Sequence, residues 1–166
     1  PAEFIPSVRK GIEATLERGI LGGFPIVDVK VVLLDGSFHP VDSSDMAFRT
    51  CASICFKNAF NKANPILLEP MMKIEINTPD DYIGAITGDF NRRRGRIESM
   101  RRYRKGSQKL NGFVPLKEMF GYATALRNLS SGRANYSMEF HQYTPISADL
   151  QQKVLKEIAD RKKEEK

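Results

Sequence analysis

The first third of the chain carries two hydrophobic periodicities. Apolar residues recur at helical spacing from residue 5 to residue 16, and glycines at positions 19, 22 and 23 end that helix. Residues 26–34 are rich in β-branched side chains, which predicts a strand, and the Asp35-Gly36 pair that follows is typical of a turn. Residues 42–45 form a capping sequence for a second helix, which ends at Asn64-Pro65. The predicted order is α-β-α.

A lone strand between two helices is an incomplete unit, because no neighbouring strand completes its hydrogen-bond ladder. We therefore expect that strands upstream of Pro1 are missing from residues 1–68, and that the exposed strand edge lets the chain self-associate. The apolar face of the second helix contains Cys51 and Cys55, which we interpret as small core residues. At a helical spacing of four they lie too far apart for a good disulfide, which favours a reducing compartment.

The middle of the chain alternates strand and helix patterns. Strands are predicted at residues 72–76, 96–103, 108–114 and 136–140, and helical stripes at residues 83–90 and 116–129. This β-α-β-β-α-β order predicts a ferredoxin-like domain, with an antiparallel four-stranded sheet under two helices. A boundary near Glu69 and a terminal helix capped by Ser147 complete an α+β chain divided into residues 1–68, 69–143 and 144–166.

Charge is concentrated in the middle of this 166-residue chain. Residues 91–105 hold eight Arg or Lys against one acid, while the whole chain has a net charge of +6, so all other residues sum to −1. Such a cluster usually faces an anionic surface, and we expect it to contact the phosphates of RNA or DNA. The alternative is a solvated basic hairpin that serves only solubility. The cluster consists of Arg92, Arg93, Arg94, Arg96, Arg101, Arg102, Arg104 and Lys105.

Part of this cluster also has a structural explanation. The first three arginines are predicted in the last turn of a helix, where cations complement the carbonyl end of the helix dipole. Eight cations in fifteen residues exceed what capping requires, so phosphate contact remains the better account. The strands carry no aromatic run of the kind that RNA-recognition motifs use, so base stacking on the sheet is not expected.

Motifs for catalysis, cofactors and metals are absent from the sequence. It contains no phosphate-binding loop, no dinucleotide fingerprint and no nucleophile elbow. Its two cysteines, with His39 and His141, match no zinc spacing, so we expect no metal, no cofactor and no catalytic residue in this chain. A small ferredoxin-like enzyme such as an acylphosphatase, with an Arg–Asn phosphate site, remains an alternative. No apolar run approaches the roughly 20 residues that span a bilayer, so no membrane contact is expected.

One loop is a candidate contact site. His39 lies in DGSFHPVDSS, residues 35–44, a polar loop between the predicted strand and the second helix. Loops held by rigid elements often make contacts, and a histidine there could stack on exposed bases or hydrogen-bond to sugars. The alternative is a plain turn with an exposed, neutral histidine.

Five segments carry a dense and collinear resemblance to the C-terminal part of elongation factor G, the GTP-driven translocase of bacterial and organellar ribosomes. The resemblance runs from Pro1 to about Tyr143 in PAEFIPSVRKGIEATLERGILGGFPIVDVKV, DGSFHPVDSSDMAFR, KANPILLEPMMKIEI, GDFNRRRGRIESM and VPLKEMFGYATALRNLSSGRANYSMEFHQY. It implies that residues 1–68 are most of domain four, with a fold like the second domain of ribosomal protein S5. Residues 69–143 then correspond to domain five.

The resemblance also implies partners and sites. In this family the tip of domain four enters the decoding centre and lies against tRNA and mRNA, and domain five contacts ribosomal RNA, here through the basic cluster. GTP and Mg would bind an upstream GTPase domain, so this chain is not expected to hydrolyse GTP. The expected location is the bacterial cytoplasm, with the mitochondrial matrix as the alternative. The matching tip residues are Gly36, Ser37, Phe38, His39, Asp42 and Ser43.

The segment at residues 101–112 departs from the family pattern. It is strongly basic, whereas the family is often glycine-rich and less charged there. This leaves open a paralogue that is specialised for splitting ribosomes with ribosome recycling factor. From a different class, a free-standing RNA-binding protein also remains open.

Overall fold

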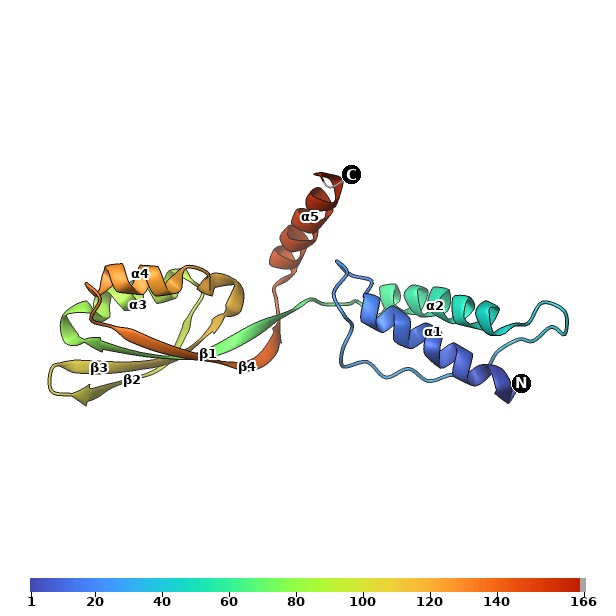
Figure 1. Ribbon diagram of the computed structural model, residues 1–166, viewed down its shortest axis with the longest axis horizontal. Coiled ribbons are helices and arrows are strands. Elements are labelled where there is room, and N and C mark those ends of the chain that lie inside the picture. Colours follow the sequence, from blue (N-terminus) through green and yellow to red (C-terminus); the bar gives the residue numbers. More distant parts are fainter. Residues whose placement is uncertain (165–166) are drawn as a thin grey trace. The chain divides into compact units, whose positions relative to one another are not determined.

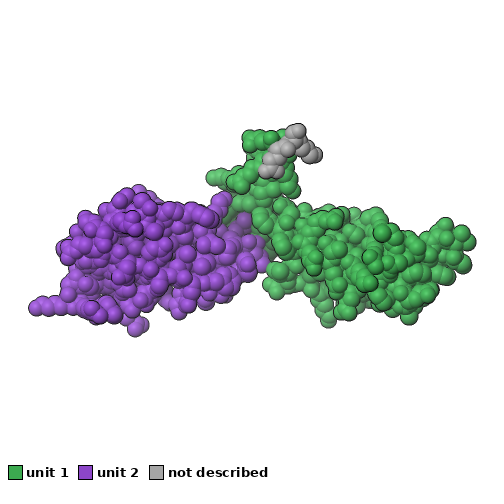
Figure 2. All heavy atoms as spheres, viewed as in Figure 1, with its two compact units in different colours: residues 1–67, 147–166 green, residues 68–146 purple. Residues whose placement is uncertain are grey.

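The computed structural model describes residues 1–164 and divides the chain into two compact units (Figure 2). One unit consists of residues 68–146, and the other joins residues 1–67 to residues 147–166. The C-terminal helix is therefore grouped with the N-terminal residues, whereas the sequence pattern set residues 144–166 apart. Helices and an antiparallel sheet make up the chain, so the predicted α+β class is confirmed.

The unit at residues 68–146 is built on one four-stranded sheet. Its strands are β1 (Leu68–Pro79), β2 (Arg96–Arg104), β3 (Ser107–Pro115) and β4 (Asn135–Pro145). They lie in the order β2-β3-β1-β4, and every neighbouring pair is antiparallel. Two helices, α3 (Ile83–Arg92) and α4 (Tyr122–Leu129), cover one face of the sheet (Figure 1). This is the ferredoxin-like arrangement that the sequence predicted.

Alternation along the strands divides the sheet into an apolar and a polar face. Ile74 and Ile76 of β1 point toward the helices, while Lys73 and Glu75, which alternate with them, lie on the opposite face. The helices contribute side chains spaced three or four residues apart, so that one stripe of each helix is buried. Together these form a single core of Ile74, Ile76, Ile86, Phe90, Leu110, Val114, Met119, Tyr122 and Leu126.

The second helical stripe is not one helix. The prediction of a continuous helix over residues 116–129 is wrong, because a short 3-10 helix η3 (Leu116–Met119) precedes α4. Gly121 separates them with a left-handed φ of 72°, a conformation that glycine adopts without steric cost. A similar 3-10 turn, η2 (Asp80–Tyr82), leads into α3.

In the other unit, two helices pack together through small residues. Helix α1 (Ile5–Arg18) follows a short 3-10 turn η1 (Ala2–Phe4), and α2 (Asp45–Lys62) begins at Ser44, whose Oγ accepts a hydrogen bond from the Ala47 amide. Gly11 of α1 lies so close to α2 that a Cβ would stand 2.4 Å from the Arg49 carbonyl oxygen. Helix α5 (Ala148–Glu164) belongs to the same unit, where the Gln151 side chain accepts from the Leu67 amide at 2.8 Å.

The predicted strand over residues 26–34 is wrong. The segment is irregular, because no strand among residues 1–164 pairs with it and an unpaired strand has no ladder to hold it. Its apolar side chains, including Val29 and Leu33, are exposed. The interpretation of Cys51 and Cys55 as core residues is also wrong, since both are exposed. The two helices meet through the small residues of α1, so their apolar stripes line an open groove of about 700 Å³ instead of a packed core.

A glycine in β3 provides a test of the packing in the sheet unit. A Cβ on Gly112 would lie 2.6 Å from the Arg96 carbonyl oxygen and 3.0 Å from the Phe90 ring, so Gly112→Ala should lower the free energy of unfolding by about 1–3 kcal/mol. Gly88→Ala is the matched control in α3, where nothing lies within 4 Å, and it should raise stability by about 0.5–1 kcal/mol. Urea unfolding of both variants measures these changes, and equal effects would contradict the close approach of β3 to α3.

Candidate nucleic-acid interface

The first candidate contact is the loop at residues 36–43, between the irregular segment and α2. The His39 side chain is 65% exposed, and its Nδ1 lies 3.3 Å from Asp42 Oδ2 and 3.4 Å from the Val41 amide nitrogen. Nδ1 accepts from Val41 when the imidazole is neutral and pairs with Asp42 when it is protonated. Either way Nε2 is left for a partner outside the loop, which suits hydrogen bonding to a nucleotide.

This loop is fixed by its own hydrogen bonds and by aromatic stacking. The His39 amide donates to Ser43 Oγ at 3.0 Å, and the Ser43 amide donates to the His39 carbonyl at 3.1 Å. The Phe38 ring lies 6.0 Å from Phe4, which stacks on Phe48 of α2 at 4.4 Å. The six predicted tip residues therefore form one closed loop, anchored to both helices, with Gly36, Ser37, Phe38, His39 and Asp42 exposed and Ser43 half-buried.

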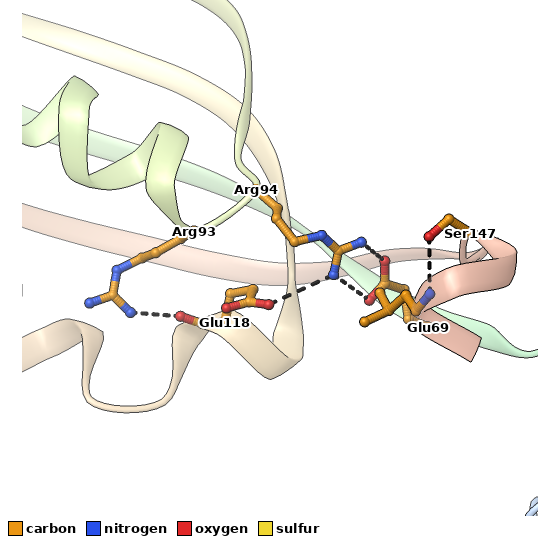
Figure 3. A network of polar contacts seen from close by, with 6 residues as sticks. Glu69, Arg93, Arg94, Glu118 and Ser147 are labelled. Carbon is orange, nitrogen blue, oxygen red and sulfur yellow. Dashed lines mark hydrogen bonds and ion pairs between the residues drawn. The ribbon is translucent and has the colours of Figure 1, made fainter. Parts of the chain in front are cut away.

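The basic cluster separates into two groups, one held by partners within the unit and one exposed. The prediction that its first three arginines lie in the last turn of a helix is wrong beyond Arg92. Arg93 directly follows α3 as its C-cap residue, and Arg94 has a left-handed φ of 61°. The side chains of Arg93 and Arg94 turn toward carboxylate and carbonyl groups of the same unit (Figure 3).

Arg94 holds two segments of the unit together. Its guanidinium donates to Glu69 at 2.6 Å and 3.1 Å and lies 3.7 Å from Glu118 (Figure 3). The Glu69 side chain is only 14% exposed, so the carboxylate depends on this partner. The hydrogen bond with Glu69 raises the pKa of Arg94, which keeps the side chain charged. This bidentate pair joins the start of β1 to the turn after α3.

The Arg93 side chain contacts residues of α3, η3 and α4. Its Nε donates to Asp89 at 2.7 Å and one terminal nitrogen donates to the Glu118 carbonyl at 2.6 Å. Its guanidinium also lies 5.0 Å from the centre of the Tyr122 ring. Burial raises the pKa of Tyr122, so this phenol stays neutral beneath the cation. Arg93 and Arg94 therefore stabilise the fold and do not present free cations.

The exposed group lies mainly on the hairpin of β2 and β3. Arg104 pairs with Ser107 across the strands, which places Lys105 in the two-residue turn with Gly106. On β2, Arg96 lies 5.4 Å from the centre of the Phe113 ring, and His141 of β4 lies 4.6 Å from the same ring. Arg94 is also exposed but its guanidinium is paired with Glu69; the other exposed cations of the cluster are Arg92, Arg96, Arg101, Arg102, Arg104 and Lys105.

The structure adds two residues that the sequence pattern did not single out. Lys109 of β3 pairs with Arg101 of β2, and its Nζ lies 4.6 Å from the centre of the Tyr103 ring. The turn alone did not signal this pair, because a two-residue turn at residues 105–106 would place residue 101 opposite residue 110. A register shift between Arg102 and Arg104 places it opposite Lys109 instead. The charged surface is therefore wider than the run of residues 91–105.

Neither a metal centre nor a membrane span is found in the described part of the chain. Residues 1–164 contain no group of three or more His, Cys, Asp or Glu side chains that could hold a metal ion. No helix in that range is long and apolar enough to cross a bilayer.

Removal of Arg94 should affect folding and not only surface charge. Arg94→Ala leaves the half-buried Glu69 carboxylate without its partner, so we expect the free energy of unfolding to fall by about 1–2 kcal/mol. Arg102→Ala removes the same charge from an exposed position and should change stability by less than about 0.5 kcal/mol. Thermal and urea unfolding measure both variants, and a loss no larger for Arg94→Ala than for Arg102→Ala would refute the structural role of Arg94.

Two family models together match almost the whole chain. Residues 1–64 match the family described as "Elongation factor G, domain IV", and residues 66–154 match "Elongation factor G C-terminus". A crystal structure of a protein from Thermus thermophilus is 34% identical and superposes with a TM-score of 0.82, covering 96% of this chain and 24% of that protein. The chain thus spans about a quarter of the length of the solved structure that it matches. It belongs to the elongation factor G family of translation factors and comprises the domain IV and C-terminal regions of that family.

Proposed function

We propose that this chain is the part of an elongation factor G that contacts tRNA, mRNA and ribosomal RNA and promotes their movement through the ribosome. The observation that carries the proposal is the closed loop at residues 36–43, which holds an exposed His39 at a defined position. A contact that acts by occupying space needs a stiff support, because a mobile loop would yield to the tRNA. The Phe38–Phe4–Phe48 stack and the Ser43 hydrogen bonds supply that support.

The sheet unit supplies the second contact in this proposal. Its exposed cations suit the phosphates of ribosomal RNA, whereas Arg93 and Arg94 are already paired within the unit. Because the likeness covers only part of a longer relative, GTP and Mg would bind a GTPase domain in the rest of the protein. The same likeness supports the bacterial cytoplasm as the location, with the mitochondrial matrix as the alternative.

A role in ribosome recycling is the second candidate. The basic segment at residues 101–112 favours it, because this segment departs from the glycine-rich pattern of the family. Complementation separates the two roles: a translocation factor restores peptide elongation, whereas a recycling factor restores ribosome splitting only together with ribosome recycling factor. Self-association of the isolated chain is also proposed, through the exposed apolar side chains at residues 26–34 and not through the strand edge that the sequence led us to expect.

His39 provides the test of the loop. In the full-length protein, His39→Ala should slow movement of tRNA and mRNA about 10-fold, since one specific contact is removed, and should leave ribosome-stimulated GTP hydrolysis within about twofold. Stopped-flow translocation and phosphate-release assays measure the two rates. His141→Ala is the control for loss of an exposed imidazole on the other unit and should leave both rates unchanged. Parallel loss of both activities in His39→Ala would mean that His39 supports folding only.

Salt dependence provides the test of the basic hairpin. Replacing Arg92 and Arg102 by Gln removes two exposed cations, which should reduce the slope of log K against log salt for ribosomal RNA by about 1–2. The matched control replaces Lys153 and Lys156 of α5 by Gln, with the same change in charge, and should leave the slope unchanged. Fluorescence anisotropy over a series of salt concentrations measures both double variants. Equal slopes for the two would assign the hairpin to solubility.

A further inference from the structure

The face of the four-stranded sheet that the helices leave open contains a polar hollow. It has a volume of about 310 Å³, at the lower end of the roughly 300–1,000 Å³ range of small-ligand sites. The helices α3 and α4 lie on the other face (Figure 1), so this hollow is not part of the core. Its main lining residues are Lys73, Glu75, Ser99, Arg101, Asn111 and Ser137.

An exposed aromatic ring is connected to the hollow by direct contacts. Tyr103 of β2 is 49% exposed and adds nothing to the buried core. Lys109 Nζ lies 4.6 Å from its ring centre and also 2.8 Å from Glu75 Oε1, which lines the hollow. The hydrogen bond from Lys109 lowers the pKa of Glu75, so this ion pair is present at neutral pH and holds Lys109 against the ring.

The second cation on the ring is not held in place by an ion pair. The Arg104 guanidinium lies 5.1 Å from the Tyr103 ring centre, and Arg104 makes no ion pair among residues 1–164. A planar group that displaces Arg104 would gain a stacking contact, and Arg104 could then meet a phosphate. One cation is therefore fixed to the ring while the other can exchange.

The mixed chemistry of the hollow suits one nucleotide better than a run of phosphates. Glu75 and Glu98 would repel a duplex backbone, but carboxylates accept hydrogen bonds from base amino groups. Asn111 and Ser99, joined at 3.3 Å, offer an amide and a hydroxyl that can reach a base edge or a 2′-hydroxyl. Arg101 supplies the cation for the adjoining phosphate.

We propose that this open face binds one unpaired RNA nucleotide, with its base stacked on Tyr103 and its edge turned into the hollow. The proposal deepens the ribosomal RNA contact proposed above and rests on it. It also revises the expectation that no base stacks on this sheet, because that expectation considered runs of aromatic residues and not a single ring beside a polar hollow.

Two RNA probes and three variants of the whole chain test this site. The probes are a single-stranded hexa-adenylate RNA with 2-aminopurine at its fourth position and a blunt 12-base-pair RNA duplex. The original chain should quench the fluorescence of 2-aminopurine when the base stacks on the ring. Tyr103→Ala should abolish this quenching and weaken single-strand binding about 5- to 150-fold, the loss expected for one base stack. Tyr103→Phe keeps the ring and should bind within about twofold of the original chain. Phe120→Ala removes an aromatic residue that is 81% exposed before α4 and should have no effect.

The outcomes separate this site from the broader proposal. Duplex affinity and its salt slope should be unchanged in Tyr103→Ala, because no cation is removed. If Tyr103→Ala weakens both probes equally, or changes neither, the stacking site is overturned while the phosphate contact stands. If neither probe binds the original chain, both the site and the RNA contact of the sheet unit are overturned.

Discussion

The close approach of Phe90 to two glycines determines how helix and sheet meet in the unit at residues 68–146. A Cβ on Gly95 would stand 2.5 Å from the Phe90 ring, and one on Gly112 would stand 3.0 Å from it. The chain can therefore turn directly from α3 into β2, and β3 can lie beneath the helix. The position of the basic hairpin follows, because β2 and β3 leave this contact in a fixed register and carry Arg101, Arg102, Arg104 and Lys105 toward their far end.

Charge in this unit serves two purposes that composition alone does not separate. Arg93 pairs with Asp89, and Arg94 pairs with Glu69 and Glu118. Together with the hydrogen bond from Arg93 to the Glu118 carbonyl, these contacts hold the end of α3 to β1 and η3. The cations toward the tip of the hairpin, Arg101, Arg102, Arg104 and Lys105, form no ion pair with a buried carboxylate among residues 1–164. The basic stretch therefore contains two kinds of residue. Arg93 and Arg94 stabilise the fold, and only the unpaired cations are available to an RNA backbone.

Sequence patterns predicted the sheet unit well because each of its elements has a partner within the chain. The alternation from Met72 to Ile76 is satisfied by β3 and β4, so local preference and long-range pairing agree. Residues 26–34 are also rich in β-branched side chains, but no strand among residues 1–164 lies beside them. Side-chain composition alone does not provide the backbone hydrogen bonds of a sheet. Within the candidate interface, the loop around His39 follows from its turn and capping residues. The proposed role of Tyr103 depends on contacts with Lys109 and Arg104, which no local pattern reveals.

Arg94 also constrains how this position can change over evolutionary time. Its left-handed backbone costs about 1–2 kcal/mol for a residue other than glycine, and its ion pairs with Glu69 and Glu118 offset that cost. A change to glycine would relieve the backbone but leave two carboxylates without their partner, while loss of either carboxylate would remove part of the compensation for the strained arginine. We therefore expect substitutions at these three positions to be correlated. A homologue with glycine at position 94 should have neutral residues at positions 69 and 118.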